Sequence, residues 1–202
     1  MANCPVCFVD SCIDSSACEP YSAGGWVAVY FTNACDVSSK SFAAAGGDPM
    51  ALLDNFTLKS GKALFTAKFN KSTGMQLDSA MTKPGGYIWT HTMTMDFSQF
   101  SPEALSALEK HLGSEIFVIA EDRKGKFWCF GIGTEGLQIT TWNFAHGRLG
   151  TDNKIHTPTW TLSDGFRPLE LQYYTANPGD PTDIYQKTKD FLDSLVNCNL
   201  SA

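Results

Sequence analysis

The chain has 202 residues, of which 43% are hydrophobic and only 18% are charged, and its formal net charge is −6. This length accommodates one domain with a sizeable core, whereas two independent domains would be small. Binding to a phosphate backbone requires clustered Lys and Arg, and the densest basic stretch is the short run at 123–126. We therefore expect no sequence-specific binding to nucleic acid.

The low charge content is combined with fourteen Phe and five Trp. So many aromatic side chains indicate extra apolar surface, which a large core or a subunit interface can bury. We favour subunit interfaces, and hence self-association.

The start of the chain has neither the positively charged segment nor the long apolar segment of a secretory signal. The longest apolar runs are also far shorter than a membrane span. We expect a product that first appears in a cytoplasm and does not insert into a membrane.

Residues 1–24 are rich in Cys, Ser, Asp and Gly and lack periodicity, which predicts an irregular arm. Zinc sites commonly use two paired C-x2-C units, and this arm has one such pair, Cys4 and Cys7. Reduced thiols, disulfides formed outside the cell and metal ligation all stay open for the arm, and we assign no metal site. Five of the seven cysteines lie in the first 35 residues: Cys4, Cys7, Cys12, Cys18 and Cys35.

Strands are predicted along most of the remaining chain. β-Branched and aromatic residues predict a first strand at 26–31, and Ser, Ala, Gly and Asp-Pro predict a flexible connection at 33–50. The segments 116–120 and 127–130 flank a glycine-ended loop and predict a hairpin. The other predicted strands lie at 56–58, 63–69, 89–97, 137–144, 157–162 and 169–174.

The segment 89–97 alternates most regularly. Its odd positions are Trp, His, Met, Met and Phe, and its even positions from 90 to 94 are all Thr. This pattern is typical of a half-buried strand. We expect His91, on the apolar side, to be a hydrogen-bonded core or interface residue rather than a metal ligand.

Two helices are predicted. Ser101 is a good N-cap, Pro102 suits the first helical position and Gly113 supplies a stop, so a short helix is expected at 101–112. A second, amphipathic helix is expected from Pro181 to about Asn197. The predicted fold is thus mainly β (α+β): an antiparallel β-sandwich or barrel at 25–176 with the helix 101–112, an arm at 1–24, and a C-terminal helix and tail at 177–202.

The motifs of known enzymes are weak or missing. Gly131, Gly133 and Gly136 match G-x-G-x-x-G, but a dinucleotide site needs a helix after the third glycine, and the β-favouring residues 137–142 follow instead. We interpret this motif as a turn between strands. The four histidines have no metal-binding spacing, and the sequence contains no nucleophile elbow, Walker loop or Cys-His peptidase signature. We therefore predict no catalytic residue, no cofactor and no enzyme.

The organisation of residues 26–176 resembles the tail tube proteins of tailed bacteriophages and related injection systems. The shared features are a β meander with a long loop, a short mid-chain helix and further antiparallel strands. The hairpin at 116–133 is similar to the central hairpin of virion proteins from phages that infect Bacteroidetes, and the segment 147–154 before the Thr-rich strands adds to the likeness. The Cys-rich arm and the C-terminal helix depart from a minimal tube subunit, which leaves neck, connector and tail-completion roles open.

The resemblance implies a structural virion protein located in the tail after assembly in the host cytoplasm. Its partners would be itself, in stacked and hexameric rings, and other tail or neck proteins. The sheets of a ring would join into an inner β-barrel without free edges, and an acidic subunit would let DNA pass as cargo. Two Thr-rich strand faces are candidates for a polar face: Thr90, Thr92 and Thr94, or Thr157, Thr159 and Thr161.

Two other classes of function stay open at this point. The first is an extracellular β-sandwich binding module that is clamped by its cysteines. The second is an enzyme that uses the cysteines.

Overall fold

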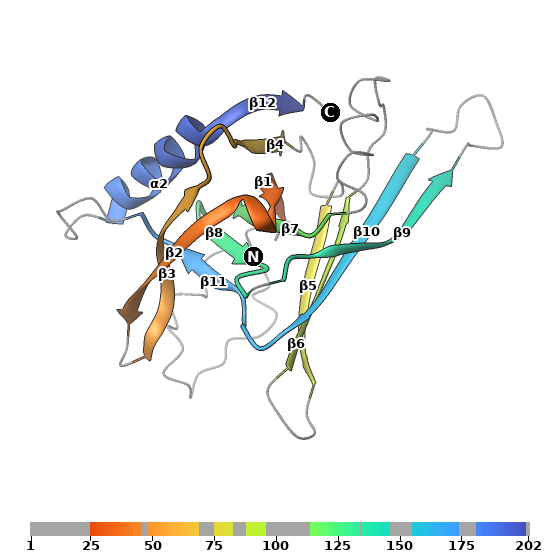
Figure 1. The fold of residues 1–202 in the computed structure, drawn as a ribbon, viewed down its shortest axis with the longest axis horizontal. Helices are drawn as coiled ribbons and strands as arrows, with labels where there is room; N and C mark the ends of the chain where they lie inside the picture. Colours follow the sequence, from red (N-terminus) through yellow and green to blue (C-terminus); the bar gives the residue numbers. More distant parts are fainter. Residues whose placement is uncertain are drawn as a thin grey trace, which may run out of the picture.

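The computed structural model describes residues 25–45, 48–68, 75–82, 88–95, 114–133, 135–145, 155–173 and 181–200. Within these residues the protein is mainly β, with two sheets and the helix α2 (Pro181–Leu195) (Figure 1). The predicted mainly β, sandwich-like class is therefore confirmed. The predicted arm at 1–24 and the predicted helix at 101–112 lie outside the described residues.

The larger sheet has eight strands in the order β12-β4-β1-β7-β8-β11-β3-β2. Its pairs are antiparallel except for β12 with β4 and β11 with β3, which are parallel. We call it the large sheet. Its strands are β1 (Trp26–Asn33), β2 (Val37–Ala45), β3 (Asp48–Leu58), β4 (Leu64–Lys68), β7 (Ile116–Asp122), β8 (Phe127–Phe130), β11 (Leu169–Leu171) and β12 (Val196–Leu200).

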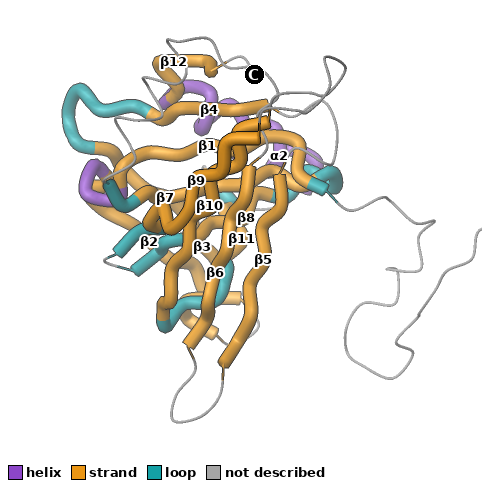
Figure 2. The backbone as a smooth tube through the Cα atoms, turned by 90° about the vertical axis from the view of Figure 1, so that its right-hand side faces the viewer, coloured by secondary structure: helices purple, strands orange, loops and turns teal. Residues whose placement is uncertain are grey.

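The second sheet has four strands in the order β5-β6-β10-β9, and all three pairs are antiparallel. We call it the small sheet. In Figure 2 its strands lie side by side on the near side of the molecule. They are β5 (Met75–Thr82), β6 (Ile88–Met95), β9 (Gln138–Ala145) and β10 (Ile155–Asp164).

One core fills the space between the two sheets. The alternation of β6 buries His91, Met93 and Met95 and leaves its threonines half-buried, as predicted. The central strand β7 is buried on both faces, which explains its unbroken apolar run. The core residues are Val29, Phe31, Met75, Met93, Met95, Ile116, Val118, Ala120, Phe130, Leu137, Trp160 and Leu162.

A second core lies on the other face of the large sheet, beneath α2 (Figure 1). Leu192 of α2 is fully buried there. A polar cluster also ties α2 to the sheet, because the Tyr185 hydroxyl donates to buried Glu121 (2.8 Å) and the Lys189 ammonium lies 3.6 Å from the same carboxylate. Buried charges of this kind are tolerated only when they are paired.

The structure corrects two predictions about elements and adds one strand. The flexible connection predicted at 33–50 is wrong, because β2 and the start of β3 occupy most of it and pair with each other. The strand β5 was missed by the sequence prediction. The C-terminal helix ends at Leu195 rather than near Asn197, since β12 begins at Val196 and pairs with β4.

Candidate functional site

The outer face of the small sheet carries a patch of threonines. Because side chains alternate along a strand, the core-facing residues of β6 and β10 leave Thr90, Thr92, Thr94, Thr157, Thr159 and Thr161 on the opposite face. The register places Thr94 opposite Thr159 and Thr92 opposite Thr161. The Oγ1 atoms of Thr94 and Thr159 are 3.3 Å apart. The two sets of candidate threonines, 63 or more residues apart in the chain, thus form one surface.

The outer strands extend this surface. β5 adds Gln76 and Asp78, whose side chains are joined by a 2.6 Å hydrogen bond, and β9 adds Gln138, Thr141 and Asn143. We call this surface, together with the six threonines, the threonine face. Among its described side chains Asp78 is the only charged one. It is therefore a hydrogen-bonding surface with little charge, suited to contact without strong electrostatic attraction.

The small sheet ends in two similar edges. The strands β5 and β9 are terminal, and no described strand pairs with the outer side of either. Three successive antiparallel pairs make β9 run opposite to β5. Natural edge strands are commonly protected by charged residues, Pro, bulges or short length. These two strands have eight residues each and contain no Lys, Arg or Pro, although β5 carries Asp78 and the pairing of β9 has one irregularity in register.

His91 lies in the middle of the small sheet and is 1% exposed. Its Nδ1 lies 2.8 Å from the Ser79 hydroxyl, and its Nε2 lies 3.0 Å from the Phe166 carbonyl oxygen. Burial lowers the pKa of His91, and the hydrogen bond to Phe166 and the charge of Asp164 oppose this shift. The prediction of a hydrogen-bonded core histidine is confirmed.

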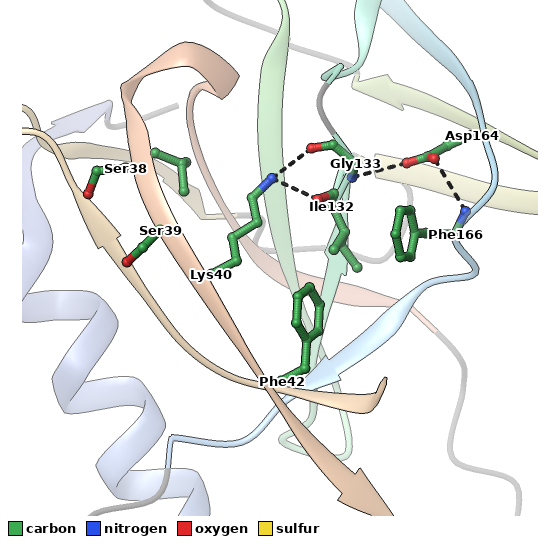
Figure 3. Close-up of a pocket in the computed structure, with 9 residues that line it drawn as sticks. Ser38, Ser39, Lys40, Phe42, Ile132, Gly133, Asp164 and Phe166 are labelled. Atoms are coloured by element: carbon green, nitrogen blue, oxygen red, sulfur yellow. Dashed lines mark hydrogen bonds between the residues drawn. The ribbon is translucent and has the colours of Figure 1, made fainter. Parts of the chain in front are cut away.

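A surface cavity of about 470 Å³ lies between β2 and the loops after β8 and β10 (Figure 3). The Lys40 ammonium donates to the carbonyls of Ile132 (2.8 Å) and Gly133 (2.9 Å), and Asp164 accepts from the backbone N–H groups of Gly133 and Phe166. Burial lowers the pKa of Lys40, which the charge of Asp164 counteracts. Both charged groups form hydrogen bonds with backbone groups. We therefore interpret them as a structural contact that holds β2 against the two loops. Sequence patterns did not single out this cluster, because its members are far apart in the chain.

The remaining sequence candidates are dispersed. Gly131 follows β8 with a φ of 72°, and β9 rather than a helix comes after Gly136, so the interpretation of a turn is confirmed. His111 and His146 lie outside the described residues, as do the cysteines of the arm. His156 lies on β10, and its side chain is not described.

Cys35 and Cys129 are both free thiols. Cys129 is fully buried, which raises the pKa of its thiol. Within the part of the chain that the structure describes, no group of three His, Cys, Asp or Glu side chains is placed to hold a metal ion.

Comparisons with protein-family models, with curated proteins and with solved structures found no match to this chain. Among the described helices, none has the length and apolar character needed to cross a membrane.

Proposed function

We propose that the protein is a structural subunit of a phage tail that assembles into rings through its small sheet and encloses a channel for DNA. The observation that supports this proposal most strongly is the pair of oppositely directed edges, β5 and β9, with whose outer sides no described strand pairs. Antiparallel pairing of β5 from one copy with β9 of the next continues the sheet without changing its pattern. Repetition of this contact around an axis closes a ring and removes every free edge of the small sheet.

The dimensions suit a DNA channel. Six copies contribute about 24 strands, which at about 4.8 Å per strand span a circumference of about 115 Å. The backbone cylinder is then about 37 Å across, and strand tilt in a barrel widens it. After about 5 Å of side chains on each wall, a channel of about 27 Å or more remains, which is wide enough for a DNA duplex.

The orientation of the sheet determines what lines the channel. The large sheet covers the apolar side of the small sheet, so the threonine face is the side that points inward when the ring closes. Hydroxyl and amide groups keep such a wall hydrated, and Asp78 supplies a negative charge per copy. A wall of this kind does not attract the phosphate backbone, so DNA can pass through without being held.

The proposal is tested by electron microscopy of the purified protein together with sedimentation analysis over a range of concentrations. We expect rings or tubes with an open centre. A 22.1 kDa monomer at every concentration, with no assembly when tail or neck partners are added, would refute the proposal and favour a binding module.

A further inference from the structure

The core between the sheets ends in partly buried side chains at both edges of the small sheet. One cross-strand row on the core side runs from Leu77 through Met93 and Trp160 to Ile139. The two middle residues are buried, at 0% and 2% exposure, whereas Leu77 and Ile139 at the ends are only partly buried. The row therefore stops at half-covered apolar side chains on both sides.

Each edge carries a second apolar residue on the same side. Met81 of β5 is 47% exposed, and Trp142 of β9 is partly buried against the same core. In the pleat of β5, Leu77 and Met81 lie on one face, and in β9 the core-side positions are Ile139 and Trp142, with an irregularity in register between them. Each edge of the sheet thus presents two apolar side chains.

We infer that these four residues form an apolar seam between neighbouring copies of this chain, with Leu77 and Met81 of one copy packed on Ile139 and Trp142 of the next. This inference rests on the proposed function, because it specifies the side chains that meet when β5 joins β9. Barrel closure staggers the register between strands. The two residues of β5 therefore meet the two residues of β9, and we do not assign which residue lies opposite which. Assembly completes the core of every subunit.

A second copy fits these edges better than another occupant does. The β5 edge offers an outer row with the polar residues Gln76 and Asp78, and a mainly apolar inner row in which Ser79 lies between Leu77 and Met81. The β9 edge offers the same order, with Gln138, Thr141 and Asn143 outside. Antiparallel joining matches polar with polar and apolar with apolar across the junction, so each edge is complementary to the other edge of the same chain.

The test uses two variants with opposite charges at the seam, Leu77→Lys and Ile139→Glu. Each variant alone places one unpaired charge at every junction, which is costly to bury. We expect the concentration needed for assembly, followed by sedimentation, to rise at least about 100-fold for each. In an equal mixture, a ring of alternating variants has Lys opposite Glu at half of its junctions and the native pair at the other half, so assembly is restored.

Controls separate this inference from general damage. Val27→Lys changes an exposed apolar residue of the large sheet (37% exposed) and should leave assembly unchanged. A second mixture combines Leu77→Lys with Trp142→Glu instead of Ile139→Glu. It is needed because the register at the junction decides whether residue 77 lies opposite residue 139 or residue 142. Circular dichroism confirms that each variant is folded.

The outcomes distinguish the two proposals. Suppose that the unchanged protein forms rings. The seam is then refuted, and the ring stands, if Leu77→Lys and Ile139→Glu each assemble normally alone. The same conclusion follows if neither Ile139→Glu nor Trp142→Glu restores assembly when mixed with Leu77→Lys. If the unchanged protein forms no rings, even when tail or neck partners are added, the proposed function itself fails, and with it the seam.

Discussion

His91 illustrates how one residue connects three segments of the chain. Its ring joins β6 to Ser79 of β5 and to the Phe166 carbonyl after β10. It also packs nearly perpendicular to the ring of Phe130, with the centroids 5.6 Å apart. The neutral ring satisfies both contacts, since one nitrogen donates to the carbonyl and the other accepts from the hydroxyl. Protonation adds a charge at a buried position.

This arrangement predicts a pH dependence of stability. The pKa of His91 is lower in the folded protein than its usual value of 6.5, so the unfolded state binds the proton more readily. The contribution to stability is fully present above pH 6.5 and is lost as the pH falls from there through the folded-state pKa. Urea unfolding at pH 7.5 and 5.5 should show a lower free energy of unfolding at the lower pH.

The matched variant for this experiment is His91→Gln, whose amide can still donate to the Phe166 carbonyl but does not titrate in this range. Its free energy of unfolding should change less between the two pH values. Equal pH dependence in both proteins would assign the effect to other groups.

Gly136 gives a second prediction at a single residue. A Cβ atom there would lie 2.6 Å from the Ile116 backbone oxygen and 2.7 Å from the Ile116 backbone nitrogen. Ile116 forms an isolated antiparallel bridge with Leu137, the residue that precedes β9. We expect Gly136→Ala to lower the free energy of unfolding by about 1–3 kcal/mol through overpacking. Gly165→Ala is the control, because its Cβ meets nothing within 4 Å. Denaturant unfolding of both variants measures the difference, and similar values would contradict the close approach.

At the scale of elements, α2 is held to the large sheet by its apolar side. Leu192 is fully buried in the second core, and Phe191 contacts the ring of Phe56. A Leu to Ala change at such a site typically costs about 2–5 kcal/mol. We therefore expect Leu192→Ala to lower the free energy of unfolding by this amount, measured by circular dichroism in urea. Exposed Ser194→Ala should change it little, and a small effect of Leu192→Ala would mean that α2 is only loosely attached.

The sequence predicts elements where local signals agree with tertiary packing. The strand at β6 was found because Thr alternates with large apolar residues, and β7 and β8 because apolar runs flank a glycine-ended loop. β2 and β5 were missed because they are rich in Ser, Ala, Asp and Met, which have little intrinsic preference for strands. Their strand structure depends on pairing with β3 and β6.

The candidate site was predicted only in part, for a related reason. The polar faces around Thr92 and around Thr159 are each visible as local alternation. Their adjacency depends on the pairing of β6 with β10, and the edges depend on the missed strand β5. Strand order is a non-local property that no local pattern contains. The polar face of each strand was therefore predictable, whereas their union in one surface and the positions of the sheet edges were not.

At the scale of the whole molecule, the two sheets differ in how they treat their surfaces. The large sheet is covered on one side by the small sheet and on the other by α2 (Figure 1). The second core lies between the large sheet and α2. The small sheet has one covered face, one polar face and two edges with which no described strand pairs. In the proposed ring, the small sheet would form the contacts between copies and the channel wall, and the large sheet would contribute most of the buried core.

The proposed channel wall leads to a prediction about DNA. In the proposed ring, Thr159 lies on the threonine face between Thr94 and Thr141, away from Asp78. Thr159→Lys adds one positive charge per copy to the wall, so assembled rings should retain short duplex DNA that the unchanged rings release. Retention should fall steeply as salt increases, because bound phosphates release counterions.

The position of the charge, rather than its presence, is what this experiment tests. Ser39→Lys adds the same charge at an exposed site on β2 of the large sheet, which the proposed ring places away from the channel. Co-sedimentation of labelled duplex with each assembled variant measures retention. Strong retention by Thr159→Lys and weak retention by Ser39→Lys would support a threonine-lined channel, since only the first variant surrounds the DNA with several lysines at once. Equal retention by both variants would mean that the threonine face does not line the passage for DNA.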